Sequence, residues 1–270
     1  MNCKNCKIEL AENNGYCHAC GARIIKNRLT FKNLMAQAGE EFFNYDNKLL
    51  KTLKHLLTRP EDVIDGYIQG IRKKYVNPIS FFTISLTLSG LIAFLVSNYF
   101  RDDIMLPSFA QGDQSEGLIE TQNKTFDFIT SYTSLFASLS IPFTALLSYI
   151  IFLNKKYNLT EHIILNLYAY SQIAIATFFM ALPVVLIAPE YYSFTGLITI
   201  PLYFLYYSYI FIKVFDLSFL QYVLKSLLFG GTIFLLIILL GIVMFILMKS
   251  GIVDPGQFAP VPPPETPPTN

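Results

Sequence analysis

Four cysteines stand in two pairs near the start of the chain, and their spacing indicates chemistry more clearly than any other residues do. Cys3 and Cys6 form one C-x-x-C pair, and Cys17 and Cys20 form a second pair after ten intervening residues. Two such pairs can place four thiolates in a tetrahedron around one Zn²⁺. We therefore expect a zinc ribbon over residues 1–24, with a structural zinc ion held by these four cysteines.

Other chemistries are open to the same residues. Two disulfides would suit a secreted protein, and a C-x-x-C pair can carry a redox-active thiol. The duplicated pairs favour metal binding, because a redox site needs only one reactive pair. His18 lies inside the second pair and is expected at the surface, because four cysteines already complete the coordination. A zinc ribbon by itself indicates no function.

Glu161 and His162 are the best catalytic candidates in the rest of the chain. A histidine held by a carboxylate can accept a proton or bind a metal. Asn166 follows His162 by four residues, so the two would share one face of a helix. The simpler interpretation is a helix start with Thr160 as the N-cap and Glu161 in the first turn. Both interpretations stay open.

A third cluster consists of three consecutive cations, Arg72, Lys73 and Lys74. They precede an Asn77-Pro78 step and a long apolar stretch, which places them at the level of the lipid headgroups. Their expected role is contact with the membrane surface, which also fixes the orientation of the chain. A site for a substrate phosphate or a lipid phosphate is the alternative.

The elements that must position these residues are membrane spans. Of the 270 residues, 53% are apolar and only 14% are charged, and the mean hydropathy is +0.44. A soluble domain carries roughly 25% charged residues. Five stretches without Asp, Glu, Lys or Arg are each long enough to cross a bilayer as a helix. We expect an all-α membrane protein with a five-span transmembrane domain over residues 79–248, its spans at 79–98, 132–153, 163–188, 193–212 and 226–248.

The remaining segments lie before, between and after the spans. Residues 25–78 are expected to form two juxtamembrane amphipathic helices, one over 40–57 and one that begins at Pro60 and ends at Asn77-Pro78. The apolar face of the first could lie in the bilayer interface or pack on the bundle. We expect an extracytoplasmic loop at 99–131 and a disordered Pro-rich tail at 249–270.

The positions of Lys and Arg predict the orientation. With the N-terminus inside, the short segments near the membrane carry eight Lys and Arg on the inner side and three on the outer side. Basic residues near membrane spans remain on the cytoplasmic side. The N-terminus is therefore expected in the cytoplasm and the C-terminus outside it. A reducing cytoplasm argues against disulfides in the cysteine head.

Three features carry a family resemblance. They are the four-cysteine head, Glu161-His162 at the start of the third span, and the stretch over residues 53–78 with its Arg-Pro, Tyr-x-x-Gly-x-Arg and Asn-Pro steps. Together they resemble the DUF3667 family, which consists of bacterial membrane proteins of unknown function. The resemblance implies a zinc-ribbon-headed multi-pass protein of the bacterial cytoplasmic (inner) membrane. It implies no activity.

The residues within the expected spans exclude some classes of membrane protein. The five spans hold no ionisable Asp, Glu, Lys, Arg or His, which argues against carriers and proteases that depend on buried carboxylates. We expect a non-catalytic adaptor or regulator that contacts the lipid bilayer and docks a cytoplasmic protein through the ribbon. Nucleic acid is not expected as a partner, because no aromatic residues interleave the basic ones. The alternatives are a permease or channel for a small solute or lipid, built on Tyr-rich spans kinked at Pro142, Pro183 and Pro201, and a membrane enzyme that uses Glu161 and His162.

Overall fold

The structure is a computed structural model of the 270-residue chain, in which two compact units cover residues 1–47 and 48–270. Each unit is described by itself. The residues that the structure describes are 2–9, 15–22, 24, 47–100 and 126–249. Most of the expected loop 99–131, the tail beyond residue 249 and the first part of the expected helix 40–57 lie outside them.

The small unit repeats one backbone turn around its two cysteine pairs. The N–H of Lys7 donates to the carbonyl of Cys3 at 2.9 Å, and the N–H of Gly21 donates in the same way to Cys17 at 2.9 Å. Lys7 and Gly21 both have positive φ, at 65° and 69°. An antiparallel bridge between Asn2 and Glu9 closes the first turn. The two C-x-x-C pairs are thus structurally equivalent, as a ribbon requires.

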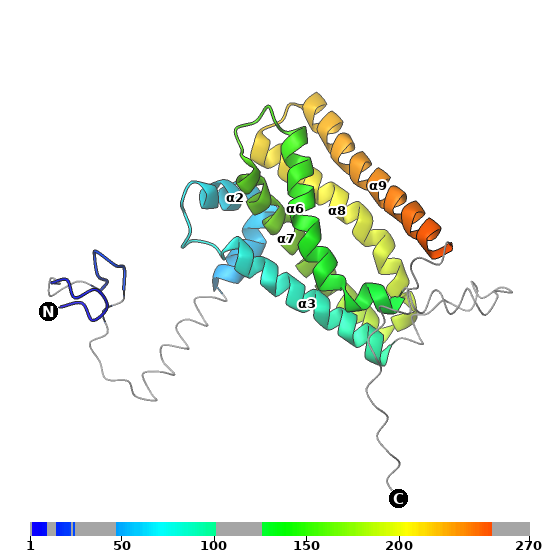
Figure 1. The fold of residues 1–270 in the computed structure, drawn as a ribbon, viewed down its shortest axis with the longest axis horizontal. Coiled ribbons are helices and arrows are strands. Elements are labelled where there is room, and N and C mark those ends of the chain that lie inside the picture. Colours follow the sequence, from blue (N-terminus) through cyan, green and yellow to red (C-terminus); the bar gives the residue numbers. More distant parts are fainter. Residues whose placement is uncertain (1, 10–14, 23, 25–46, 101–125, 250–270) are drawn as a thin grey trace, which may run out of the picture. The chain divides into compact units, whose positions relative to one another are not determined.

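The large unit contains five helices that are long and apolar enough to cross a membrane. This confirms the expected five-span, all-helical architecture among the described residues and supports a multi-pass membrane protein. Figure 1 shows the five helices side by side, with α9 along one edge. They are α3 (Pro78–Tyr99), α6 (Thr133–Ile151), α7 (Leu159–Ile187), α8 (Tyr192–Phe215), preceded by the short 3-10 turn η2 (Pro189–Tyr191), and α9 (Phe219–Lys249).

Helix α7 is the centre of the bundle. It packs against α3, α6 and α8, while α9 packs against α6 and α8 (Figure 1). Pro142, Pro183 and Pro201 lie inside α6, α7 and α8, as expected from the sequence. Each removes one backbone N–H from its helix. The central helix α7 carries most of the buried polar side chains discussed below, because it is covered by neighbouring helices.

Local sequence explains where two of the spans begin. Helix α3 starts at Pro78, and the side chain of Asn77 accepts a hydrogen bond from the N–H of Ile79 at 2.9 Å. Helix α7 starts after Asn158, whose side chain accepts from the N–H of Glu161 at 3.0 Å. The expectation that Thr160 caps this helix is wrong by two residues, because Asn158 already occupies the cap.

Two helices precede the first span. Residues 47–58 are helical, and α2 (Pro60–Ile68) follows directly. The expectation that this second helix continues to Asn77-Pro78 is wrong. The chain leaves the helix at Gly70, whose φ of +100° is far from helical values. Tyr75 is buried, but it reaches the core from a bend and not from a helical stripe.

Candidate functional site

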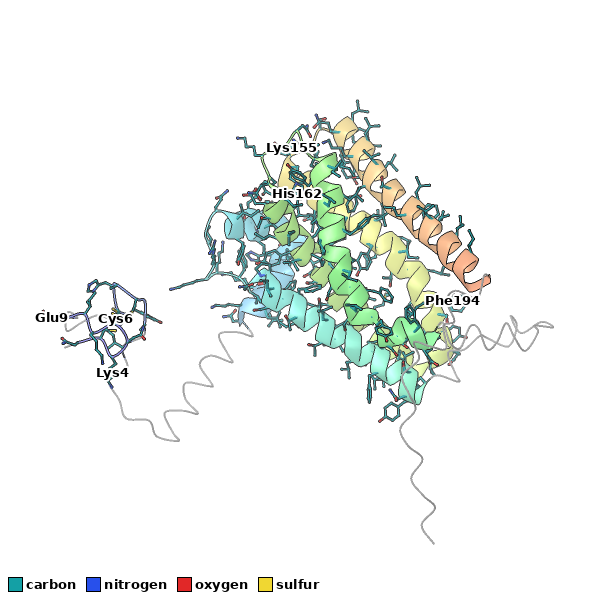
Figure 2. The ribbon with its side chains drawn as sticks, viewed as in Figure 1. Lys4, Cys6, Glu9, Lys155, His162 and Phe194 are labelled. Carbon is teal, nitrogen blue, oxygen red and sulfur yellow. The ribbon has the colours of Figure 1, made fainter. Side chains whose placement is uncertain are left out.

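The four cysteines of the small unit come together at one point. Their sulfur atoms all lie within 4.8 Å of one another, and the Sγ atoms of Cys3 and Cys20 and of Cys6 and Cys17 are 3.7 and 3.6 Å apart. All four are free cysteines, since a disulfide would need a separation of about 2.0 Å. In Figure 2 the sulfur of Cys6 faces the interior of the unit. The cluster could hold a metal ion.

The surroundings of the thiols differ in a way that suits a shared cation. The backbone N–H of Ala22, then the Asn5 side chain, lower the pKa of Cys20 to about 6. The backbone N–H of Ile8 also lowers the pKa of Cys6, but the Cys20 thiol and burial outweigh it and raise that pKa to about 12. Four thiolates this close repel one another unless a cation lies between them. His18 is exposed, as expected.

The helix over residues 47–58 is joined to the bundle through its last carbonyls. The hydroxyl of Tyr206 donates to the carbonyl of Leu56, and that of Tyr209 donates to Leu57, each at 3.0 Å. Carbonyls in the last turn of a helix have no partner within the helix. Both tyrosines belong to α8, so this span caps the helix. We call these two contacts the carbonyl clamp.

A second set of contacts ties the bend before α3 to the same place. The buried hydroxyl of Tyr168 donates to the carbonyl of Val76 at 2.7 Å, and the N–H of Val76 donates to the Thr52 hydroxyl at 3.0 Å. His55 Nδ1 and the Tyr75 hydroxyl are 2.8 Å apart. The helix 47–58 therefore packs on the bundle, with Leu56 and Thr52 fully buried. Of the two placements considered for its apolar face, the structure has packing on the bundle.

The three cations after α2 are exposed. The guanidinium of Arg72 lies 5.6 Å from the centre of the Tyr67 ring, and the Lys74 ammonium lies 5.1 Å from that of Tyr75. Burial, followed by the charges of Arg59, Lys51 and Lys74, lowers the pKa of His55. Basic side chains from the helix 47–58 and from the bend are therefore close enough to form one positive surface.

Glu161 and His162 do not act on each other in this structure. Glu161 forms a capping box with Asn158, whose N–H donates to Glu161 Oε2 at 2.7 Å. This is the helix-start interpretation, with Asn158 in place of Thr160. The fully buried His162 points instead toward α6, near the turn that links α6 and α7 (Figure 2).

The partners of His162 are a hydroxyl and an amide. Its Nδ1 lies 2.9 Å from Ser148 Oγ, and Asn166 Nδ2 donates to Ser148 Oγ at 3.1 Å and to the His162 carbonyl at 2.8 Å. The rings of Tyr149, Tyr157 and Phe215 surround the imidazole. His162 Nε2 and Asn166 Oδ1 have no partner. Among the described contacts of this histidine there is no carboxylate that could orient it for catalysis.

The sequence correctly predicted that Asn166 lies next to His162, because the two are one helical turn apart. It missed Ser148, which comes from another helix, and it missed the carbonyl clamp. The acceptors of the clamp are backbone atoms, and these carry no sequence signal. The Tyr-rich character of span 193–212 was the only available hint.

Comparison with known proteins supports one part of this picture. Residues 46–90 match the model of the DUF3667 family, which is described as a protein of unknown function. The match confirms the resemblance over a segment that contains the helix 47–58, α2 and the first half of α3. It thus includes the clamped carbonyls and the three cations. No curated protein and no solved structure matches the chain.

Proposed function

We propose that this protein is a non-catalytic membrane adaptor or regulator, in which a zinc-bound cytoplasmic head docks a protein partner. The observation that carries the proposal is the carbonyl clamp. The helix 47–58 is the first described element after the head, and Tyr206 and Tyr209 fix its end to α8. A partner that binds the head would thereby be tethered to a membrane unit whose first described helix is fixed on the spans.

Zinc is the metal that the head fits best. A tetrahedral site with Zn–S bonds of about 2.3 Å has sulfur–sulfur edges of about 3.8 Å. The sulfur–sulfur separations of 3.7 Å between Cys3 and Cys20 and 3.6 Å between Cys6 and Cys17 are close to this value. Four thiolates without a water ligand are typical of structural rather than catalytic zinc. The zinc would stabilise the head, and the residues exposed on its surface would make the contact with a partner.

The catalytic alternative has less support from the geometry. Glu161 is engaged at the helix cap, and His162 is fully buried between a serine, an asparagine and aromatic rings. A general base must come within hydrogen-bond reach of a substrate proton. We therefore assign structural roles to both residues. The distribution of Lys and Arg, together with the family resemblance, supports a bacterial cytoplasmic membrane as the location, with the head in the cytoplasm.

The zinc test uses the purified full-length protein. Metal analysis should find one zinc per chain, and Cys17→Ser should lose it, because three thiolates hold the ion much more weakly than four. His18→Ala is the matched control, since His18 lies next to Cys17 and is exposed; it should keep the zinc. Wild-type protein without zinc, or zinc retained in Cys17→Ser, would contradict the assignment.

The adaptor test compares variants in cells whose own gene is deleted. Cys17→Ser should fail to restore the deletion phenotype although it inserts into the membrane. Glu161→Gln should restore it, because glutamine retains a side-chain acceptor for the capping box but removes the acid. Loss of function in Glu161→Gln with normal insertion would instead favour the enzyme.

A further inference from the structure

A cavity of about 480 Å³ lies among α6, α7, α8 and α9. This is within the range of roughly 300–1,000 Å³ that is typical of small-molecule sites. Its inner wall is aromatic and comes from Tyr170 of α7, Tyr203 and Tyr207 of α8, and Phe229 of α9. None of the residues that line it carries a formal charge. The cavity is therefore suited to an apolar ligand.

The aromatic wall is packed against itself. The ring centres of Tyr207 and Phe229 are 5.4 Å apart with nearly parallel planes, and those of Tyr203 and Tyr207 are 6.5 Å apart. Phe229 also meets the buried Phe211 edge to face at 4.9 Å. Rings that are fixed in this way give the cavity a preformed surface.

The outer rim of the cavity shows where a ligand enters. Ile200 of α8 and Phe234 of α9 are 71% and 63% exposed, although both line the cavity. The cavity is thus continuous with the outer apolar face of two helices that can cross a membrane. In a bilayer this face meets lipid hydrocarbon. The entrance lies between α8 and α9.

One end of the cavity is set by a close approach of these two helices. A Cβ atom built on Gly230 would lie 2.5 Å from the Cδ2 and Cε2 atoms of Phe204. Only glycine lets the Phe204 ring rest directly on the backbone of α9. Any larger residue at position 230 would push this ring away.

Besides the three tyrosines, the lining contains two hydroxyl side chains, and both donate to backbone carbonyls of α6. Ser140 donates to the carbonyl of Ala137, and Thr144 donates to that of Ser140, each at 2.8 Å. The rest of the lining is aromatic or aliphatic apart from one glycine, so hydrocarbon fits it best. We propose that the cavity binds one hydrocarbon chain of a membrane lipid, which enters between α8 and α9.

A second cavity of about 330 Å³ shares Tyr170 and Tyr203 with the first but has a more polar lining. Hydroxyls of several threonines line it, and Thr177 Oγ1 is buried there without a partner. Leaving a buried hydroxyl against hydrocarbon carries an energetic cost. We therefore assign the lipid chain to the larger cavity.

The protein contains no tryptophan, so a tryptophan introduced by substitution can be used as a probe of the cavity. Phe229→Trp puts a single tryptophan in the cavity wall, and Phe81→Trp puts one at a fully buried position that does not line the cavity. In liposomes of phosphatidylcholine brominated along one acyl chain, bromine quenches tryptophan on contact. Emission should be quenched strongly in Phe229→Trp and weakly in Phe81→Trp. Equal quenching in both would overturn the proposal.

A filling substitution checks that the chain sits in this cavity. The excess quenching is the amount by which quenching in Phe229→Trp exceeds that in Phe81→Trp. Ser140→Phe, added to Phe229→Trp, should abolish this excess quenching, because the new ring occupies the cavity. Ser138→Phe adds the same ring on the exposed side of α6 and should leave the excess quenching unchanged. Excess quenching that survives Ser140→Phe would place the lipid elsewhere.

A second measurement applies if the tryptophan variants fail to fold. Lipid phosphorus can be counted on detergent-purified protein without any fluorophore. Ser140→Phe should carry one lipid fewer than wild type, and Ser138→Phe should carry the same number. Equal lipid content in all three proteins would overturn the proposal. None of these readouts depends on zinc or on the adaptor role.

Discussion

Tyr206 and Tyr209 make the same kind of hydrogen bond in two different environments. Both donate to a carbonyl at the end of the helix 47–58 at 3.0 Å, but the bond from Tyr206 is buried and the one from Tyr209 is exposed. Water can replace an exposed donor, whereas a buried carbonyl that loses its donor remains unsatisfied. The two residues therefore form a matched pair for measuring what the carbonyl clamp contributes.

We expect Tyr206→Phe to lower the free energy of unfolding by about 1–3 kcal/mol, because it leaves the buried carbonyl of Leu56 without a donor. Tyr209→Phe should have a much smaller effect. The measurement is thermal unfolding of the purified protein in detergent. Equal melting temperatures for the two variants would mean that the clamp does not hold the helix.

Asp65 gives the juxtamembrane region a predictable pH dependence. Burial, then the charges of Glu61 and Asp62, raise its pKa from 3.8 to about 6, and its Oδ1 has no partner. Because the folded pKa is raised, the stabilisation that comes from the protonated form is fully present below pH 3.8. It is lost as the pH rises through about 6.

Asp65→Asn should therefore raise the melting temperature at neutral pH and give little change under acidic conditions below the unfolded pKa. The amide removes the charge that the folded state disfavours. Asp62→Asn should raise the melting temperature less, because Asp62 is only one of the charges that raise the pKa of Asp65 and its ion pair with Arg59 at 3.8 Å is a kind of contact that contributes little. A stabilisation by Asp65→Asn that is independent of pH would rule out this cause.

At the scale of elements, two glycines in and after α2 differ in whether the backbone requires glycine. Gly70 has a φ of +100°, in a region that side chains rarely adopt. Gly66 lies inside α2, and a Cβ there would meet Ile71 Cδ1 at an ordinary 3.8 Å. The first glycine is needed for the backbone to leave the helix, and the second is not needed for its conformation.

Gly70→Ala should destabilise the protein by about 1–2 kcal/mol, the approximate cost of a left-handed conformation for a residue with a Cβ atom. Gly66→Ala should be neutral or stabilise it by up to about 1 kcal/mol, because alanine favours the helix. Denaturation of both variants in detergent would measure the difference. If Gly70→Ala were as stable as wild type, the backbone at this position would not require glycine.

The same bend shows how far the sequence could predict the elements. Long charge-free stretches predicted all five spans, because a bilayer requires continuous apolar helices. Apolar periodicity through Ile71 and Tyr75 wrongly extended α2, since a single glycine at positive φ outweighs a periodic pattern. A helix start with Glu161 in the first turn was predicted, but its N-cap was placed at Thr160 instead of Asn158. Contacts between elements, such as Ser148 with His162 or Tyr206 with Leu56, depend on tertiary packing that a single sequence does not encode locally.

At the scale of the whole molecule, cations mark one end of the large unit. Lys155 Nζ donates to the carbonyl of Phe215 at the end of α8, and Lys225 Nζ donates to that of Ile151 at the end of α6. Lysines at helix C-termini satisfy carbonyls and oppose the negative end of the helix dipole. The side chains of Arg72, Lys73 and Lys74 lie at the surface, where they can act on the membrane.

We therefore expect the exposed cluster to fix the orientation of the chain in the membrane. A reporter fused before Met1 should read as cytoplasmic and one fused after Asn270 as extracytoplasmic, because five spans separate the two ends. Replacing all three cations with glutamine should weaken this orientation, since each contributes about 1 kcal/mol near an anionic leaflet. Arg72→Lys should retain it, because lysine carries the same charge. Normal orientation in Arg72→Lys together with a lost cellular function would show that Arg72 binds a phosphate or carboxylate through its planar guanidinium, which lysine cannot replace.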